Sequence, residues 1–270
     1  MPRINIGTIT LNYAVEGTGE ALLFIPGLIG LHSAWDYQIA HFSKSHLCIS
    51  FDHRGAGRSD KPVGRENYST GLVAQDVVGL LDALGVEKVT AVGTSTGGCV
   101  VQNLALDHPD RLERCIFCNT WTKADIYIHR LQTLRKWIAQ SHGADAYVEF
   151  SSILTNGAMQ FRYDLDRVLD LESRAKETIG SIEVIAARVD MTLTHDRLAE
   201  LGRIDHPSLV IGTKDDVTVP AYFAEDIHAA IRESRLVILP DGGHYSYRRY
   251  PEQWNAIVGE FLADTRQGAG

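Results

Sequence analysis

Residues 92–98 read VGTSTGG, and this heptad decides the fold. Gly93 and Gly97 flank Ser95 at positions minus two and plus two, the G-x-S-x-G spacing of a strand that turns sharply into a helix. Side chains at the two glycine positions would clash in so tight a turn. Residues 88–92 form a short β-rich run, and residues 99–106 have helical character. The heptad therefore predicts a strand, an elbow and a helix, with Ser95 presented as a nucleophile.

Outside the heptad, short apolar runs alternate with helical stretches along much of the chain. The runs that predict strands are 21–25, 47–51, 89–92, 115–118, 208–211 and 235–239. Helices between most of them imply a largely parallel sheet covered on both faces. Residues 4–16 alternate like an edge hairpin. The expected fold class is therefore α/β.

This alternation stops between residues 122 and 201, where no convincing strand is present. Helix patterns occupy 126–140, 144–154, 165–179 and 182–191, and Asp125 or Asp164 could cap their starts. Aromatic residues in this region either line a pocket or pack between helices. We expect a core of residues 1–121 and 201–270, with a helical cap of residues 122–200 inserted in it.

Composition excludes several classes of protein. The chain has 270 residues, of which 44% are hydrophobic, enough for a sizeable core. Its net charge of -8 and the lack of a basic stripe argue against a nucleic-acid partner. No apolar stretch is long enough to span a membrane, and the first residues lack the layout of a signal peptide. We expect a cytoplasmic protein without a membrane partner; the sequence leaves a homodimer open.

The cysteines predict neither a metal site nor a redox pair. Cys48, Cys99, Cys115 and Cys118 all lie in or beside apolar segments, where a thiol packs as a small hydrophobe. Cys115 and Cys118 have C-x-x-C spacing, but residues three apart in a strand point to opposite faces. We expect no metal and no organic cofactor.

A serine nucleophile needs a base, and the base needs an acid to orient it. His244 is the best of the 11 histidines, because a Pro-Asp-Gly-Gly turn at 240–243 separates it from a predicted strand. Asp215 and Asp216 follow another predicted strand. From position alone, either carboxylate could orient His244.

The order of these residues resembles the α/β-hydrolase superfamily, whose nucleophile, acid and histidine follow one another in this way. Residues 212–220, GTKDDVTVP, are similar to the G-T-x-D-x-V-T-x-P segment of 3-oxoadipate enol-lactone hydrolases. That resemblance aligns the family acid with Asp215 and favours it over Asp216. Asn119 stands where some relatives carry the acid, which also supports the later site.

The same resemblance implies an oxyanion hole made by backbone N–H groups. Residues 24–28, FIPGL, occupy the place of the family's H-G-x loop, with Pro26 instead of histidine. The implied donors are the N–H groups of Leu28 and of Thr96, which follows the nucleophile. Residues 52–59, DHRGAGRS, are similar to a family loop that supports the rim of the site, so we expect a structural role for them.

Three short segments resemble a narrower group, the aminoacrylate hydrolases of pyrimidine degradation and the enol-lactonases. They are Asn-Thr-Trp at 119–121, Pro-Gly-Leu at 26–28 and Thr-Val-Pro at 218–220. Both groups act on small carboxylate-bearing substrates, so Trp121 and the cap residues Arg130 and Arg188 are predicted to contact substrate. Arg135 and Arg174 are further candidates, and the alternative is that these arginines are solvated on helix faces.

The leading expectation is a serine hydrolase with Ser95, Asp215 and His244 as its triad. It would form an acyl-enzyme from a small ester, lactone or enol- or enamine-type carbonyl compound. The same triad also suits carbon-carbon bond hydrolysis or cofactor-free perhydrolysis, which the fold does not separate. A ligand receptor or scaffold with little turnover is the alternative of another class.

Overall fold

One twisted sheet organises the protein, whose computed structural model describes residues 2–264. Within these residues the sheet has eight strands in the order β1-β2-β4-β3-β5-β6-β7-β8. The pairs β1·β2 and β2·β4 are antiparallel, and all other pairs are parallel. This confirms the predicted α/β fold with a mostly parallel sheet. The strands are β1 (Arg3–Asn5), β2 (Thr10–Glu16), β3 (Ala21–Ile25), β4 (Leu47–Phe51), β5 (Val89–Thr94), β6 (Leu112–Cys118), β7 (Ser208–Thr213) and β8 (Ser234–Leu239).

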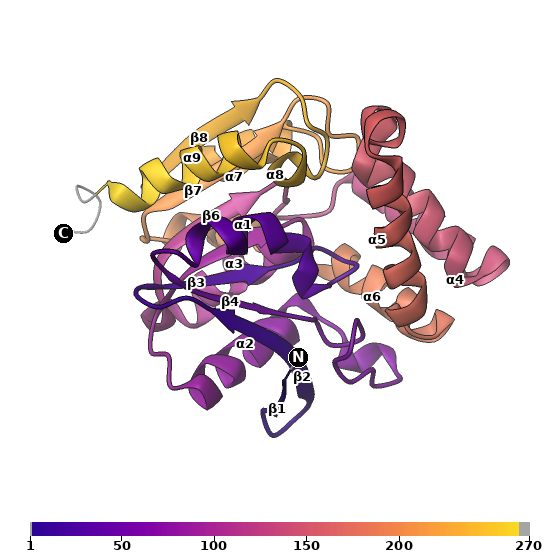
Figure 1. The fold of residues 1–270 in the computed structure, drawn as a ribbon, viewed down its shortest axis with the longest axis horizontal. Coiled ribbons are helices and arrows are strands. Elements are labelled where there is room, and N and C mark those ends of the chain that lie inside the picture. Colours follow the sequence, from indigo (N-terminus) through magenta and orange to yellow (C-terminus); the bar gives the residue numbers. More distant parts are fainter. Residues whose placement is uncertain (1, 265–270) are drawn as a thin grey trace.

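Helices cover both faces of this sheet (Figure 1). α1 (Asp36–Phe42) and α9 (Pro251–Ala263) share one hydrophobic core cluster with the sheet. α2 (Thr70–Leu84), α3 (Thr96–Asp107) and α7 (Tyr222–Ala230) share the other. Successive residues of a strand belong alternately to the two clusters, because their side chains point to opposite faces of the sheet. In β3, for example, Leu22 and Phe24 belong to the first cluster and Leu23 and Ile25 to the second.

Three helices follow one another between β6 and β7 and lie together beyond one end of the strands (Figure 1). They are α4 (Ile126–Tyr163), α5 (Leu165–Thr178) and α6 (Ile182–Thr194), called the cap helices below. The division into core and cap at residues 122 and 200 stays a prediction. A short helix, α8 (Ser246–Arg249), follows the loop that carries His244.

The start and the interruptions of α4 have local causes. The Asp125 carboxylate accepts a hydrogen bond from the Ile128 N–H at 2.9 Å, which caps the helix. Asp164, the other predicted cap, makes no such bond. Gly143 and Gly157 have φ of 91° and 70°, so the helix is interrupted at both. The predicted gap between 126–140 and 144–154 falls at Gly143.

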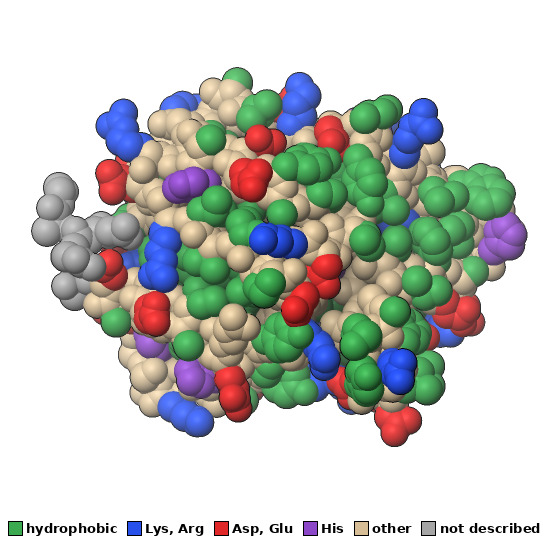
Figure 2. Space-filling view, turned by 90° about the horizontal axis from the view of Figure 1, so that it is seen from above, with side chains coloured by type: hydrophobic (Ala, Val, Ile, Leu, Met, Phe, Trp, Pro, Cys, Tyr) green, Lys and Arg blue, Asp and Glu red, His purple; other side chains and the backbone are tan. Residues whose placement is uncertain are grey.

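Hydrophobic side chains gather on the surface at the end of the molecule that the cap helices form (Figure 2). Exposed apolar residues of α4 and α5 include Ile126, Leu134, Trp137, Leu165 and Leu169. Among the described residues, no helix combines the length and the apolar character needed to cross a membrane. The homodimer left open by the sequence stays a prediction.

Candidate active site

The backbone of Ser95 is held in a strained turn between β5 and α3. Its φ is 54° and its ψ is -124°, a conformation that costs a non-glycine residue about 1–3 kcal/mol. A Cβ atom on Gly93 would lie 2.3 Å from the Gly97 carbonyl oxygen. A Cβ atom on Gly97 would lie 2.3 Å from the Ile25 carbonyl oxygen. The predicted strand, elbow and helix are confirmed, and so is the steric reason for both glycines.

Hydrogen bonds from the last residue of β6 and from Thr120, two residues after it, hold the elbow in place. The Ser95 N–H donates to the Cys118 carbonyl at 2.9 Å, and the Thr120 hydroxyl donates to the Ser95 carbonyl at 2.6 Å. Thr120 can approach because Gly98 has no side chain; a Cβ atom there would lie 2.5 Å from the Thr120 Cβ. The serine backbone is therefore fixed at both of its polar groups, as a preorganised nucleophile requires.

His244 forms a buried pair with Asp216. The distance from His244 Nδ1 to Asp216 Oδ2 is 2.7 Å, and both residues are at most 3% exposed. Asp216 Oδ1 also accepts the N–H groups of Thr218 and Val219, at 2.7 and 2.9 Å. A carboxylate at Nδ1 keeps a proton there and leaves Nε2 free to act as a base. Among the described residues, no hydrogen bond joins His244 to the Ser95 hydroxyl; such bonds commonly form only when substrate is bound.

Asp215 does not contact the imidazole, so the predicted pairing of Asp215 with His244 is wrong. Its exposed carboxylate accepts the Gly243 N–H at 2.8 Å and the Gly242 N–H at 3.3 Å. β7 ends at Thr213, and a turn closed by the Asp216 N–H and the Thr213 carbonyl follows it. This turn sends the two consecutive carboxylates in different directions. Asp215 supports the histidine loop from the solvent side, and Asp216 meets the histidine inside.

Asn119 is a site residue whose contact the sequence reasoning missed. Its Nδ2 donates to Asp216 Oδ2 at 2.8 Å and to the Thr213 hydroxyl at 3.1 Å. Asp216 Oδ2 thus receives donors from both Asn119 and His244. The sequence analysis used Asn119 as a sign that the acid lies elsewhere and as part of a family segment, without a contact to the acid. The available signal was its place after β6, the neighbour of β7 in the sheet.

The two segments expected to form the oxyanion hole both border Ser95. Thr96 is the first residue of α3, and the N–H groups of a helix's first turn have no partner within the helix. Gly27 packs against the serine; a Cβ atom there would lie 3.2 Å from the Ser95 Cβ and 3.8 Å from its Oγ. Leu28 follows Gly27 directly. The assignment of Leu28 and Thr96 as oxyanion donors stays a prediction.

Arg188 braces this loop, and its predicted contact with substrate stays a prediction. It projects from α6, is 2% exposed, and donates to the carbonyl oxygens of Leu28 and Gly55. Among the described residues no carboxylate lies within ion-pair distance of it, and burial lowers its pKa. Arg135 is likewise engaged with side chains of its own helix, and Arg174 pairs with a carboxylate one turn away.

The other two predicted substrate contacts also have different surroundings. Trp121 is fully buried in a small cluster that includes Ile128 and Phe223. Its carbonyl accepts the Gln102 amide at 2.9 Å, which holds this segment inside the core. Arg130 is exposed on α4. Neither residue borders the cavity described below, because one points into the core and the other lies on the surface.

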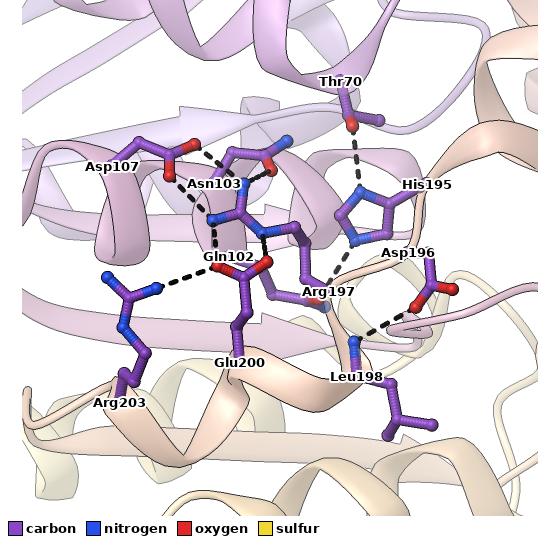
Figure 3. Close-up of polar contacts among 10 residues, drawn as sticks. All are labelled: Thr70, Gln102, Asn103, Asp107, His195, Asp196, Arg197, Leu198, Glu200 and Arg203. Carbon is purple, nitrogen blue, oxygen red and sulfur yellow. Dashed lines mark hydrogen bonds and ion pairs between the residues drawn. The ribbon is translucent and has the colours of Figure 1, made fainter.

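A buried histidine anchors α3, the helix that starts at the elbow (Figure 3). His195 Nε2 lies 3.0 Å from Gln102 Oε1, and its Nδ1 lies 2.9 Å from the Thr70 hydroxyl. Gln102 Nε2 already donates to the Trp121 carbonyl, so its oxygen accepts the proton of His195 Nε2. Thr70 then donates to Nδ1. Burial, together with the nearby Arg197, lowers the pKa of His195 to about 4, so the ring is neutral.

Arg197 lies in the segment between α6 and β7 that also carries His195, and it binds the C-terminal end of α3. Its guanidinium binds the Asp107 carboxylate with two hydrogen bonds of 2.7 and 2.8 Å, and it also pairs with Glu200 (Figure 3). The segment that returns from the cap helices to the sheet is thus attached to α3 along its length.

A cavity lies beside the Ser95 elbow. Pro26 and Gly27 form one wall, α4 and α5 form the opposite side, and Tyr245 borders it next to His244. The cavity is partly open to solvent. Glu172 of α5 also lines it.

The loop at 52–59 has contacts that agree with a structural role. The Asp52 carboxylate accepts bonds from His32 Nδ1, Asn12 Nδ2 and the Arg58 N–H at 2.7–2.9 Å. Burial raises the pKa of Asp52, but these bonds from His32 and Arg58 outweigh it and the pKa is lowered. A Cβ atom on Gly57 would lie 2.1 Å from Asp52 Oδ2, so only glycine fits there.

The four cysteines are buried and free, as expected from their apolar surroundings. Cys115 and Cys118 belong to the hydrophobic clusters on opposite faces of the sheet, which confirms that they do not face each other. Within residues 2–264, no three His, Cys, Asp or Glu side chains are grouped so that they could hold a metal ion.

The sheet, the serine elbow and the histidine loop define an α/β hydrolase, and comparison with known families agrees. The family model described as alpha/beta hydrolase fold matches residues 20–247, so the chain belongs to this family. Its relatives include proteins named "Putative carbamate hydrolase RutD". The one from Caulobacter vibrioides is 30% identical over 267 residues, covering 97% of this chain and 99% of the relative. The one from Variovorax paradoxus is 32% identical over 256 residues, covering 94% and 96%.

Solved structures show the same fold. The enol-lactonase from Burkholderia xenovorans LB400 superposes with a TM-score of 0.87 at 24% identity, covering 97% of this chain and all of that chain. A hydrolase from Pseudomonas aeruginosa has a TM-score of 0.84 at 27% identity, with coverage of 94% and 95%. The resemblance stated from the sequence motifs is thereby confirmed at the level of the family.

Proposed function

We propose that this protein is a serine hydrolase whose triad is Ser95, His244 and Asp216. The observation that carries the proposal is the strained backbone of Ser95 between β5 and α3, which is typical of a nucleophile elbow. A receptor or scaffold has no need to keep a serine at a φ of 54° with a glycine on either side.

In the proposed mechanism His244 Nε2 takes the proton of the Ser95 hydroxyl as its oxygen attacks the substrate carbonyl carbon. Asp216 holds the proton on Nδ1 and stabilises the imidazolium that forms. The protonated His244 then donates to the leaving group, which gives an acyl-enzyme. Water, activated by the same imidazole, releases the acid and restores the serine.

The negative charge on the carbonyl oxygen would be stabilised by the N–H groups of Leu28 and Thr96. The helix dipole of α3 adds a favourable field at Thr96, the first residue of that helix. Arg188 acts here as a positioning residue, because its bond to the Leu28 carbonyl fixes the peptide loop that carries the first donor.

For the substrate we propose a small carbonyl compound: an ester, a lactone or a related enol, enamine or carbamate compound. The carbamate hydrolases named above, at 30% and 32% identity, support this range. The predicted cap-arginine clamp for a substrate carboxylate does not enter this proposal, because Arg188 is engaged with backbone carbonyls.

The test is stopped-flow release of nitrophenol from short-chain esters by the wild type and by Ser95→Ala. A burst or steady turnover in the wild type alone would support acyl transfer at Ser95. Mass spectrometry of the quenched burst should find the acyl group on the peptide that contains Ser95. Turnover that survives in folded Ser95→Ala would refute the proposal.

A folded wild type that releases no nitrophenol would be tested next on activated lactones, and then for hydrolysis of carbon-carbon bonds and for perhydrolysis. Ligand binding without turnover on all of these would leave the receptor as the remaining function.

A further inference from the structure

Glu172 is a buried carboxylate without a partner in the cavity beside Ser95. It projects from α5, is 8% exposed and lines the cavity together with Gly27 and Tyr245. Among the described residues no hydrogen bond and no ion pair reaches its carboxylate. A carboxylate removed from water is costly unless a donor or a cation compensates it. Such a group facing the cavity beside Ser95 indicates that a ligand brings the donor.

The lysine one helical turn from Glu172 is bound to another carboxylate. Lys176 lies one helical turn further along α5, and its Nζ donates to the Glu149 carboxylate at 2.6 Å. Glu149 is on the neighbouring α4, so this pair joins the two cap helices on the outside. Lys176 therefore has a hydrogen-bond partner of its own, and the Glu172 carboxylate acts on it only as a minor electrostatic contribution that raises the pKa of Lys176.

The polar side chains of α4 that share the cavity are also engaged elsewhere. Asn156 Nδ2 donates to the carbonyl and to the hydroxyl of Ser152, both at 3.0 Å. The Thr155 hydroxyl donates to a carbonyl one turn earlier in α4. These donors are used within their own helix, so they do not satisfy Glu172.

Arg248 is the one cation that lines the same cavity among the described residues, and it does not pair with Glu172. Its Nε donates to the Ala34 carbonyl at 3.0 Å, and its guanidinium lies 4.7 Å from the centre of the Tyr245 ring. These contacts hold Arg248 against the core side of the cavity. Two opposite charges thus border one cavity without meeting.

We propose that Glu172 is the specificity residue of this cavity and binds an N–H donor of the substrate, an ammonium or a neutral amide-type N–H group. This rests on the proposed function, because it assigns a substrate feature to the same site. A carbonyl compound with an N–H group at its far end would place that group at α5 and its reacting carbonyl near Pro26 and Gly27. Charge-assisted N–H bonds to a carboxylate are short and strong, so the preference should be large.

The test uses small probes that need no turnover. Binding of butylammonium, butanamide, butanol and butyrate is measured by calorimetry with the wild type, Glu172→Gln and Glu177→Gln. Glu177 is exposed on the same helix and removes the same charge, which makes it the matched control. The melting temperature of each variant is recorded first.

We expect butylammonium or butanamide to bind at least tenfold more tightly than butanol and butyrate in the wild type. Glu172→Gln should weaken butylammonium at least tenfold, and Glu177→Gln should leave it unchanged. The stronger of the two N–H probes identifies which kind of donor the site takes. Should Glu172→Gln not fold, Glu172→Asp keeps the charge but shortens its reach, and it should weaken the same probe.

Equal binding of all four probes, or tightest binding of butyrate, would overturn the inference, and butyrate would point to Arg248 instead. These outcomes are independent of turnover. An active Ser95 triad with no N–H preference refutes this inference alone, whereas N–H binding at Glu172 without turnover refutes the proposed function alone.

Discussion

Replacement of Asp216 by asparagine should disable the enzyme while the same change at Asp215 should not. Asp216 has four donors: His244 Nδ1 and Asn119 Nδ2 at Oδ2, and the N–H groups of Thr218 and Val219 at Oδ1. An asparagine has one acceptor oxygen and one donor nitrogen in place of two acceptors. The asparagine cannot accept hydrogen bonds at both positions, so the orientation of its amide decides which pair of donors loses its acceptor.

With the amide oxygen toward Thr218 and Val219, the new NH2 group faces His244 and Asn119. His244 Nδ1 must then accept, which moves the ring proton to Nε2 and removes the base. With the amide reversed, its NH2 group meets two backbone N–H groups, and each unsatisfied donor costs about 1–3 kcal/mol. The first orientation is the cheaper one. We therefore expect kcat to fall about 10³- to 10⁴-fold, equivalent to about 4–5 kcal/mol of barrier.

The assay is single-turnover acylation with a nitrophenyl ester at several pH values, with thermal melts to show that each variant is folded. Asp215→Asn is the matched control, since it neutralises the adjacent carboxylate. Its exposed side chain keeps an oxygen for the Gly243 N–H, so its rate should stay within about threefold of wild type. Equal losses in the two variants, or a larger loss at Asp215, would falsify the assignment of Asp216.

Three further predictions follow from other contacts. Gly97→Ala should lose nearly all activity and several kcal/mol of stability, because its Cβ would lie 2.3 Å from the Ile25 carbonyl; a fully active variant with an unchanged urea midpoint would contradict this. Arg188→Lys should lower kcat on a neutral ester about tenfold with little change in KM, because lysine cannot hold both carbonyls; a change confined to KM would indicate substrate contact instead. The pKa of His195 in the folded protein is about 4, below its ordinary value of 6.5. Between these two pH values, His195 binds a proton in the unfolded chain but stays neutral in the folded protein. The free energy of unfolding should therefore fall by up to ~1.4 kcal/mol per unit as the pH drops through that window, and urea unfolding of His195→Gln should show a shallower slope; parallel slopes would contradict the buried neutral ring.

Much of the fold could be predicted because its signals are local. Six apolar runs mark strands that take part in the sheet, and the interrupted helical pattern after residue 122 predicts the cap helices. Within α4, the interruption at Gly157 and the continuation of the helix to Tyr163 were not predicted. Helix and strand periodicity depend on neighbouring residues, so a single sequence shows them.

The candidate site could be predicted only in part. The elbow at Ser95 could be predicted because its strained conformation depends on glycines two residues away, and His244 was favoured because a flexible turn carries it. The choice between Asp215 and Asp216 failed because the four-residue turn from Thr213 to Asp216 decides which side chain points inward. The predicted substrate residues Trp121, Arg130 and Arg188 do not line the cavity beside Ser95, since charge and aromatic character do not show whether a side chain faces a cavity.

The sequence by itself determined the order of strands and helices, the elbow at Ser95 and the class of chemistry, because each is set by residues within a few positions of one another. Only the tertiary structure decided which carboxylate meets His244, that Asn119 shares it, that Arg188 braces the Leu28 loop and that Glu172 lies unpaired in the cavity. These contacts join residues from 28 to 160 positions apart, as in the pairs His244–Asp216 and Arg188–Leu28. Their directions depend on how the sheet, its loops and the cap helices pack together, which no local pattern specifies.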